Sequence, residues 1–520
     1  MMDGREKSDP TVVAMKPAKL PARAGGELVE RRVGAEGNAD QDGTYRTPSR
    51  TSVFPGRDRI RQAARERRKE KFTALLHHVD VALLRWSYDQ LGKEAAAGVD
   101  GVTWRDYGEG LEAKLLELHA GVHRGSYRAQ PSRRHYIPKS DGRLRPLGIA
   151  ALEDKIVQRA VAEVLNAIYE EDFLGFSYGF RPGRSQHGAL DALAVAIERE
   201  RVNWIVDADI QAFFDSVGHE WLIRFIEHRV GDRRIARLIR KWLKTGVMED
   251  GKVKASEVGT PQGSVISPLL ANIYLHYVFD LWAERWRRRE ARGTVIIVRY
   301  ADDIVIGVQH RDDAERLLAA MGDRLGQFGL SLHPEKTRLI EFGRFVAANR
   351  ERRGDGKPES FDFLGFTHIC SRNRNGRFFV KRKSRRDRLR AKVQEIKAEL
   401  MRRQHDATDQ VGHWLHQVTV GWFNYHAVPQ NHDALAAFRF HILEAWLGAL
   451  RRRSQRDRTI WARINALAKR WLPQPRIRHP WPFKRFTVIN PRWEPGALIG
   501  HAGFCAGGAR QRASLPRPVQ

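Results

Sequence analysis

The sequence predicts a mixed α+β fold, because short β-branched runs and long amphipathic helices recur along one chain. Residues 294–309 carry two such runs around a Tyr-Ala-Asp-Asp turn, a pattern typical of a strand–turn–strand hairpin. Residues 153–170 place apolar side chains on one helical face, and residues 411–472 are helical and rich in tryptophan. The hairpin would carry Asp302 and Asp303 at its turn. Asp also favours turns for structural reasons, so this pair alone does not indicate catalysis.

The composition indicates a large folded protein with a polyanionic partner. The chain has 520 residues, of which 42% are hydrophobic, enough for sizeable cores. Lys and Arg number 91 against 62 acidic residues, and this net charge of +29 favours RNA or DNA as the partner. A membrane surface is a weaker interpretation, because the sequence shows no lipidation signal and no long basic amphipathic helix near a terminus.

The two cysteines, Cys370 and Cys505, allow neither a disulfide framework nor a paired zinc motif, as expected in a reducing compartment. No secretory signal opens the sequence, and no run approaches the roughly 18 apolar residues of a membrane span. We therefore expect a cytoplasmic protein that is nucleoid-associated when it binds DNA and has no membrane partner.

In chain order, residues 1–55 lack periodicity and are expected to form a flexible basic leader. The helical pattern that begins near Arg57 is basic all round at first, which suits either phosphate contact or a solvated face. Residues 135–149 predict a hairpin in which Lys139 and Arg145 converge from opposite strands. Two such cations suit a triphosphate, although an ordinary charged hairpin has the same pattern.

A basic turn with Arg181 and Arg184 follows the helix at residues 153–170. Ser185 is suited to cap the next helix. The two arginines are candidates for contact with a nucleic-acid backbone, but the segment has an equally good interpretation as an ordinary loop.

Residues 203–209 predict a short strand that ends in Asp209, where a carboxylate can reach a neighbouring hairpin turn. Asp207 and Asp215 are also acidic, so this stretch does not select a metal ligand by itself. Phe214 follows at the start of a helix. An aromatic side chain there packs either against a nucleotide sugar or, more commonly, in the core.

A polar turn at residues 259–264 precedes a long apolar helix. Its glycines let the backbone approach a ligand closely, and Gln262 offers both a donor and an acceptor. Further along, Lys336 opens a strand and places another cation near the acidic hairpin.

Residues 381–390 hold seven basic residues and one acid, and they run into a helix with one apolar face. A run of one sign favours phosphate contact over a merely solvated surface. The candidate RNA-binding residues in this run are Lys381, Arg382, Lys383, Arg385 and Arg386.

An acid at a strand end and an acid pair at a hairpin turn can together hold two divalent metal ions. Mg²⁺ prefers hard oxygen ligands and substrate phosphates, so that no His or Cys cluster is needed. Lys139 and Arg145 would neutralise a triphosphate. This combination describes a nucleotidyltransferase that acts on a template in a basic cleft.

Seven stretches occur in one order: HYIPKSDGRLRPLGI, SYGFRPGRSQHGAL, DIQAFFDS, GTPQGSVISPLLANIYL, VRYADDIVI, GLSLHPEKT and FDFLGF. With them the sequence resembles a bacterial group II intron-encoded reverse transcriptase/maturase over roughly residues 95–370, and more weakly, around GWFNY, to about residue 480. The resemblance implies a right-hand polymerase. Its fingers and its palm with an antiparallel sheet would span residues 56–370, its helical thumb/maturase domain 371–480, and a basic tail, a DNA-binding remnant, 481–520.

The resemblance also assigns roles to single residues. It implies that Asp209, Asp302 and Asp303 hold two Mg²⁺ ions and are catalytic, and it selects Asp209 because the family's acid directly precedes the Ile-Lys/Gln-x-Phe-Phe-Asp run. Lys139 and Arg145 match the family's triphosphate-binding cations.

Three further positions match the family. Phe214 stands where the family screens against a 2′-hydroxyl, Gln262 stands near the incoming nucleotide, and Lys336 matches a cation near the active site. Gln211 stands where the family often has Lys, and Ala150 where it often has Pro. Many members carry a C-terminal His/Cys nuclease domain, and because this sequence lacks the Cys pairs of that domain we expect no endonuclease.

The resemblance thus predicts an RNA-directed DNA polymerase that also binds a group II intron RNA, promotes its splicing and supports retromobility by target-primed reverse transcription. The expected partners are the intron RNA, a DNA target and primer, and dNTPs, and an oligomer is compatible with the sequence. Two alternatives stay open. One is a non-catalytic RNA-binding splicing factor, and the other is a related reverse transcriptase recruited to host defence or repair.

Overall fold

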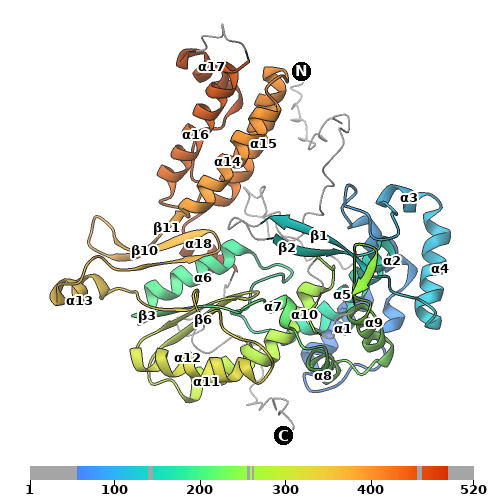
Figure 1. Cartoon of the computed structure of the whole chain (residues 1–520). Coiled ribbons are helices and arrows are strands. Elements are labelled where there is room, and N and C mark those ends of the chain that lie inside the picture. Colours follow the sequence, from blue (N-terminus) through green and yellow to red (C-terminus); the bar gives the residue numbers. More distant parts are fainter. Residues whose placement is uncertain (1–54, 139–143, 255–257, 261–262, 454–459, 490–520) are drawn as a thin grey trace, which may run out of the picture.

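A four-stranded antiparallel sheet with the strand order β6-β7-β3-β8 positions the acidic residues. The computed structural model describes residues 55–138, 144–254, 258–260, 263–453 and 460–489. The strands of this sheet are β3 (Trp204–Asp209), β6 (Val295–Tyr300), β7 (Asp303–Val308) and β8 (Arg338–Glu341). Around it lie a mainly helical region with a second sheet and a tall column of helices (Figure 1).

Both faces of this palm sheet are buried, which explains why its strands read as continuous apolar runs. Successive side chains of a strand point to opposite faces. In β6, Ile296 and Val298 share a core with Leu193, whereas Val295 and Ile297 belong to a second core. Helices α6 (Gln186–Arg199) and α12 (Arg311–Gly326) contact the sheet. Helices α10 (Ser267–Leu275) and α11 (Leu281–Arg289) contribute to the second core and are joined by a π-helical turn at His276–Asp280.

The fingers region combines helices with the sheet β2-β1-β4-β5. Strands β1 and β2 form the predicted hairpin, in which Ile137 pairs with Arg145, and β4 pairs with β1 in parallel. The strands are β1 (Ser132–Pro138), β2 (Leu144–Ile149), β4 (Val247–Glu249) and β5 (Lys252–Lys254). The helices are α1 (Pro55–Glu66), α2 (Val81–Asp89), α3 (Trp104–Gly108), α4 (Leu111–Arg124), α5 (Leu152–Asp172), α7 (Phe213–Ser216), α8 (His219–Arg229) and α9 (Arg233–Lys244), with a 3₁₀ turn at Leu76–His78.

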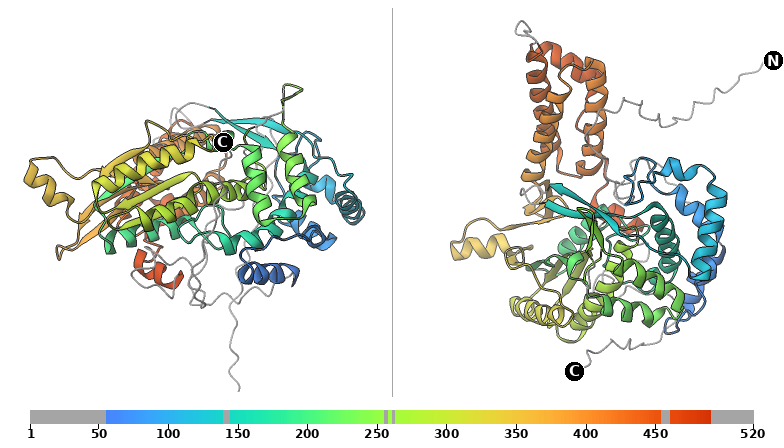
Figure 2. Two further views of the ribbon diagram at one scale, coloured as in Figure 1. Left: turned by 90° about the horizontal axis from the view of Figure 1, so that it is seen from below. Right: turned by 45° about the vertical axis from the view of Figure 1, so that its right-hand side comes forward.

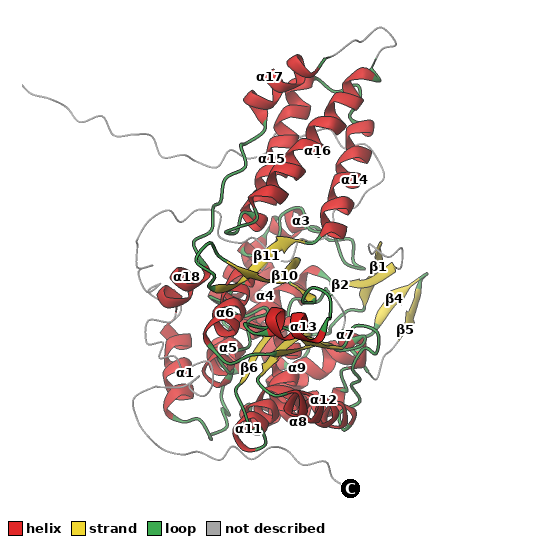
Figure 3. Ribbon diagram, turned by 90° about the vertical axis from the view of Figure 1, so that its left-hand side faces the viewer, coloured by secondary structure: helices red, strands yellow, loops and turns green. Residues whose placement is uncertain are grey.

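The thumb is a column of four helices that rises from a third sheet, β11-β10-β9 (Figures 2 and 3). Trp446 lies fully buried in the core between these helices. The strands are β9 (Ser360–Phe363), β10 (Phe366–Arg372) and β11 (Phe378–Ser384), preceded by α13 (Val346–Arg353). The helices of the column are α14 (Arg386–Arg402), α15 (Thr408–His426), α16 (His432–Arg451) and α17 (Trp461–Trp471).

After the thumb the chain returns to the palm. Helix α18 (Pro482–Ile489) lies beside α6 (Figure 3), and Phe486 is buried in the core that also holds residues of α6. Residues 1–54 and 490–520, which hold the predicted leader and most of the predicted tail, lie outside the described residues. The predicted boundary between residues 370 and 371 falls within β10.

The basic helix near Arg57 is α1, and it packs along α5. Arg57 contacts Glu163 at 2.6 Å, and Arg65 contacts Glu171 at 3.1 Å. At least two of the basic side chains of α1 are therefore paired with acidic residues of α5. In the part of the chain that the structure describes, no helix has the length and apolar character that crossing a membrane demands.

Candidate active site

The predicted acidic hairpin is present in the palm sheet. Tyr300 and Asp303 form its last pair, and Ala301 and Asp302 make the two-residue connection. Ala301 has a φ of 57°, the left-handed backbone conformation that such a tight connection requires. Gly179 lies so close that a Cβ added to it would stand 2.4 Å from the Ala301 nitrogen. Sequence reasoning missed this glycine, although its place in SYGFRPG was a signal that two backbones approach closely.

The register of β3 brings Asp209 opposite Asp303 on the neighbouring strand. Side chains opposite each other in an antiparallel pair have Cβ atoms about 4.5–5.5 Å apart. Asp302 is the next residue of the turn. The structure therefore brings together the three acids that the sequence predicted, at one end of the palm sheet.

The electrostatics of the acidic hairpin reflect this crowding. Asp303 keeps solvent contact but lies among many protein atoms, and the loss of hydration, with Asp302 and Asp209 nearby, raises its pKa to about 7. Loss of hydration also raises the pKa of Asp302, and Asp209 adds to this effect. The two carboxyl groups thus resist carrying negative charge unless a cation compensates it.

Asp207 lies on the same side of β3 as Asp209 but two residues further from the hairpin turn, opposite Val305. Burial raises the pKa of Asp207 to about 7, and the charge of Arg338 works against this rise. The position of Asp207 away from the turn agrees with the choice of Asp209 as the candidate ligand.

Lys336 reaches the site from the segment before β8. Its Nζ lies 2.6 Å from Oδ2 of Asp209. The same segment is fixed by the His333 backbone N–H, which donates to the Asp209 carbonyl at 2.8 Å. A cation is thus held beside the first of the three acids.

Arg145 approaches from the fingers. It is exposed on β2, and its charge, like that of Lys336, lowers the pKa of Asp302. The predicted partner of Arg145, Lys139, lies outside the described residues.

The glycine turn packs between α7 and β2. The Thr260 N–H donates to the Phe214 carbonyl at 2.7 Å. Gly263 has a φ of 109°, and a Cβ there would stand 2.8 Å from the Gly148 carbonyl oxygen of β2. Phe214 itself is 8% exposed. The turn therefore joins the Phe214 position to the Arg145 hairpin, and Gln262 lies outside the described residues.

The arginines of the basic turn have partners within the protein. Arg181 is buried, pairs with Glu170 at 3.0 Å and also donates to two backbone carbonyls. Arg184 donates to the Gly175 carbonyl at 2.9 Å. The predicted cap is confirmed, because the Ser185 hydroxyl accepts from a backbone N–H of α6. RNA contact by these arginines stays a prediction.

The basic run at residues 381–390 divides between buried and exposed positions. Arg382 is buried and pairs with Asp191 at 2.7 Å, and Arg385 pairs with Asp387 at 2.6 Å. Lys381 is half-buried, whereas Lys383 and Arg386 are exposed. The run begins as a strand, so alternate side chains point inward, a periodicity that its charge concealed.

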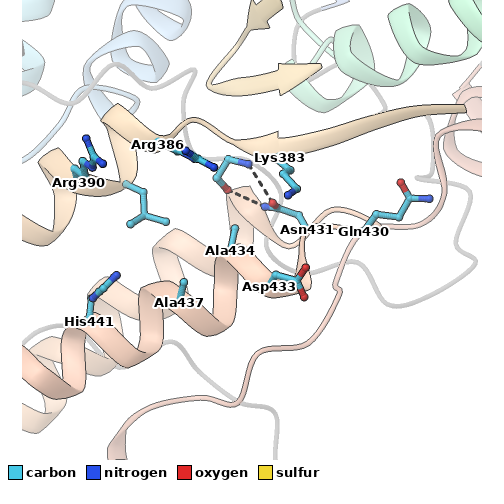
Figure 4. A pocket seen from close by; sticks show the side chains of 11 residues that line it. Lys383, Arg386, Arg390, Gln430, Asn431, Asp433, Ala434, Ala437 and His441 are labelled. Atoms are coloured by element: carbon cyan, nitrogen blue, oxygen red, sulfur yellow. Dashed lines mark hydrogen bonds between the residues drawn. The ribbon is translucent and has the colours of Figure 1, made fainter. Parts of the chain in front are cut away.

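Lys383 and Arg386 line a pocket at the base of the thumb (Figure 4). Arg390 and His441 add further nitrogen-bearing side chains, whereas Asp433 supplies one acid. The charged side chains of the lining are three cations and one acid, so the pocket carries a net positive charge.

Among the described residues, no group of three or more His, Cys, Asp or Glu side chains is arranged to hold a metal ion. The chemistry of the acidic hairpin nonetheless fits Mg²⁺. Asp209, Asp302 and Asp303 offer only carboxylate oxygens, the ligands that Mg²⁺ prefers. The raised pKa values of Asp302 and Asp303 show that their charged forms are disfavoured in the protein alone, and a bound divalent cation would stabilise those charged forms.

Comparison with known proteins assigns the chain to a family. The sequence pattern of the family "Reverse transcriptase (RNA-dependent DNA polymerase)" matches residues 137–368, which include β3, the acidic hairpin and Lys336. The chain is 34% identical over 317 residues to Protein YkfC of Escherichia coli, covering 54% of this chain and 78% of that protein. The chain belongs to the reverse transcriptase family. The mixed α+β fold and the right-hand arrangement of fingers, palm and thumb are confirmed.

This member of the reverse transcriptase family is homologous to group II intron-encoded proteins. It is 38% identical over 226 residues to Group II intron-encoded protein LtrA of Lactococcus lactis, which is 42% of this chain and 37% of that protein. It is 34% identical over 260 residues to an uncharacterized 91 kDa protein in a cob intron of Schizosaccharomyces pombe, 40% of this chain and 32% of that protein. The resemblance to this group is confirmed, although the chain matches well under half the length of these two relatives.

Proposed function

We propose that the chain is an RNA-directed DNA polymerase that uses two Mg²⁺ ions. The observation that carries the proposal is the pairing of Asp209 with Asp303 across β3 and β7, with Asp302 next in the turn. Asp209, Asp302 and Asp303 would hold the ions, and bound Mg²⁺ would stabilise the attacking and leaving oxygens of nucleotidyl transfer. This arrangement needs no other class of ligand.

The remaining candidate residues orient and neutralise the nucleotide. Arg145 and Lys336 carry positive charge on two sides of the acidic hairpin, where a triphosphate would need it. Lys139 and Gln262 complete this set in the proposal. Phe214 would limit the space beside the sugar and so disfavour a 2′-hydroxyl.

Primer extension on an RNA template tests the polymerase. Asp302→Asn should abolish extension, because an amide removes a negative ligand while it keeps the size of the side chain. Asp215→Asn is the matched control, since Asp215 is exposed on the nearby α7. The polymerase proposal fails if Asp302→Asn extends the primer as fast as the unmodified protein.

Nucleotide selection has its own test. Phe214→Ala should raise the incorporation of rNTPs relative to dNTPs, because the smaller side chain leaves room for the 2′-hydroxyl. The rate of extension with rNTPs, divided by the rate with dNTPs under the same conditions, measures this ratio. An unchanged ratio would contradict the assigned role of Phe214.

We further propose that the chain binds a group II intron RNA, promotes its splicing and supports target-primed reverse transcription from a DNA primer. The homology to intron-encoded proteins supports this proposal. The exposed cations at the thumb base, Lys383, Arg386 and Arg390, suit phosphate contact (Figure 4). The other proposed RNA-binding residues are Lys381, Arg382, Arg385, Arg181 and Arg184. The buried ones, Arg181 and Arg382, would contribute indirectly, by holding the surface elements in place through their ion pairs.

The salt dependence of RNA binding tests this surface. Each lost phosphate contact lowers the slope of log affinity against log salt by about 0.7 on single strands. The combined variant K383Q/R386Q/R390Q should therefore lower the slope by about 2, whereas the loss of two exposed charges in K252Q/K254Q, on β5 of the fingers, should leave it unchanged. An equal slope for the unmodified protein and the triple variant would contradict the assignment.

Splicing of a purified group II intron RNA separates the polymerase from its rival. If Asp302→Asn retains splicing assistance and loses extension, the chain combines both activities. If the unmodified protein assists splicing and never extends a primer, it is a non-catalytic splicing factor. A reverse transcriptase recruited to host defence or repair would extend primers without any effect on splicing.

A further inference from the structure

Directly before the acidic hairpin turn stands an arginine whose side chain is fully buried. Arg299 is 0% exposed. Its Nε and Nη2 lie 2.7 Å and 2.6 Å from the two carboxylate oxygens of Asp280. Its Nη1 donates to Asn272 Oδ1 at 3.1 Å and to the Ala301 carbonyl at 3.0 Å, and Nη2 also donates to the Ser177 hydroxyl at 2.7 Å.

A buried arginine with this many partners is costly to maintain. Removing a guanidinium and a carboxylate from water carries a desolvation penalty that their attraction offsets only with good geometry and further hydrogen bonds. The forked contact between Arg299 and Asp280 has that geometry, because a planar guanidinium matches a carboxylate at two points. Apolar residues would fill the same space more cheaply, so the pair needs another explanation.

The explanation lies in the connection to the turn. The Ala301 carbonyl that Arg299 holds belongs to the peptide that leads into Asp302. Asn272, which accepts from Arg299, also donates to the Gly179 carbonyl at 2.7 Å, and Gly179 presses against Ala301. The network therefore holds the backbone of the turn from two sides.

A π-helical turn interrupts the helical segment formed by α10 and α11, which supplies Asn272 and Asp280 to this network. Asp280 follows Asn272 by eight positions, and at about 3.6 residues per turn a regular helix would place them about 80° apart. The π-helical turn at His276–Asp280 lies between them. A π turn accommodates about one extra residue, so the eight positions complete two turns and both side chains reach Arg299.

We propose that Arg299 and Asp280 are a positioning pair that fixes the Ala301 carbonyl and thereby the aim of Asp302 and Asp303. The proposal rests on the polymerase function proposed above and adds residues that touch neither nucleotide nor metal. Misplacement of a catalytic group by about 1 Å can cost about a hundredfold in rate. A loosened turn would therefore lower both turnover and the affinity of the acids for a divalent cation.

The test compares two arginines with similar surroundings. Arg229 is 2% exposed, contacts Asp172 at 2.7 Å and donates to the Arg67 and Glu70 carbonyls, but it lies in the fingers. Lysine keeps the charge and loses the fork. Arg299→Lys should lower kcat about tenfold or more and raise the Mg²⁺ concentration for half-maximal extension, with a smaller change in KM for dNTP. Arg229→Lys should lower thermal stability and leave the Mg²⁺ dependence unchanged.

Two further readouts do not need polymerase activity. Hydrogen exchange of the amides at residues 300–304 should become faster in Arg299→Lys and not in Arg229→Lys. Binding of Mn²⁺ to the full chain, followed by electron paramagnetic resonance, should weaken in the first variant only. Equal exchange rates and equal Mn²⁺ affinity in both variants would overturn the proposal.

A double variant separates positioning from folding. Replacement of both members of a buried ion pair by apolar residues is often neutral for stability. Arg299→Met/Asp280→Leu should therefore melt above the single variant Asp280→Leu, which leaves a buried unpaired charge, and it should still show fast exchange at the turn because the Ala301 carbonyl has lost its donor. A stable double variant with normal exchange and normal Mn²⁺ affinity would overturn the proposal. If the unmodified protein does not extend primers, the polymerase proposal fails, whereas exchange and Mn²⁺ binding still decide on the positioning pair.

Discussion

Lys336 and Asp209 form an ion pair at the end of β3, with the lysine Nζ 2.6 Å from the carboxylate Oδ2. The same carboxylate is one of the three proposed metal ligands. The lysine charge therefore competes with a cation for this acid, and it also lies where a triphosphate would need compensation. These two effects act in opposite directions on two measurable quantities.

Lys336→Met separates the two effects. An exposed ion pair contributes about 0–1 kcal/mol, so loss of the lysine should lower the Mg²⁺ concentration for half-maximal extension by up to about fivefold. KM for dNTP should rise, because the triphosphate loses a counter-charge. Steady-state extension at varied Mg²⁺ and dNTP concentrations measures both. If neither constant moves, Lys336 has no role at the site.

The raised pKa of Asp303 predicts a pH-dependent stability. Its value of about 7 lies above the unfolded value of about 3.9. Between these values the folded state binds more protons than the unfolded state, so stability falls as pH rises from about 4 to about 7. Asp303→Asn cannot ionise and should melt at a higher temperature than the unmodified protein at pH 8, with little difference at pH 4.

Thermal unfolding in the absence of divalent cations measures this difference. Asp215→Asn, on the surface of α7, is the control and should leave the pH profile unchanged. A stabilisation of Asp303→Asn that is equal at both pH values would contradict the electrostatic origin of the effect.

Gly179 predicts a steric effect on the acidic hairpin. A methyl group in Gly179→Ala would stand 2.4 Å from the Ala301 nitrogen. The atoms that it meets belong to the backbone of Tyr300 and Ala301, which cannot move aside as the end of a flexible side chain could. The variant should lose stability and at least most of its extension activity. Gly421→Ala is the control, because a Cβ there meets no described atom within 4 Å and alanine favours a helix by about 1 kcal/mol. Equal activity of the two variants would show that the turn tolerates displacement.

Asp191 on α6 joins two parts of the chain. It contacts Arg382 of β11 at 2.7 Å and Arg485 of α18 at 3.3 Å, and its side chain is 2% exposed. Loss of one partner of a buried ion pair costs about 3–5 kcal/mol. Asp191→Asn should therefore lower the free energy of unfolding by about this amount in a urea titration. Asp387→Asn, in an exposed pair with Arg385, should change it by less than about 1 kcal/mol.

Local sequence patterns were sufficient to predict the acidic hairpin. The β-branched runs around Asp302 and Asp303 define two strands, and the strand that ends in Asp209 is equally clear. Resemblance to a family was needed to select Asp209 over Asp207, because both carboxylates lie at the end of the same strand. The register of β3 against β7 then places Asp209 opposite Asp303 and Asp207 two residues further from the turn, opposite Val305.

Contacts between distant elements could not be predicted. Arg181 and Arg382 belong to basic segments that suggest a surface, yet they are buried because Glu170 and Asp191 stand on other elements. Similarly, the forked contact of Arg299 with Asp280 depends on a π-helical turn, which has no simple sequence period. A run of basic residues in the sequence shows that a segment is charged, but it does not show which of its side chains are buried. Burial depends on acidic partners that only the folded chain brings together.

The return of the chain from the thumb restricts how the thumb can move. The column is continuous with the palm at β11 and α14, and after α17 the Arg478 and His479 amides donate to the Ala427 carbonyl at 2.9 Å and 3.1 Å before α18 reaches α6. The base of the column is also tied to the third sheet, because the Tyr425 hydroxyl donates to the Leu364 carbonyl at 2.7 Å and the Ser384 amide donates to Asn431 Oδ1 at 3.1 Å. The thumb is therefore held at its base by several contacts rather than by one strand of chain, and we expect the column to move as one body about that base.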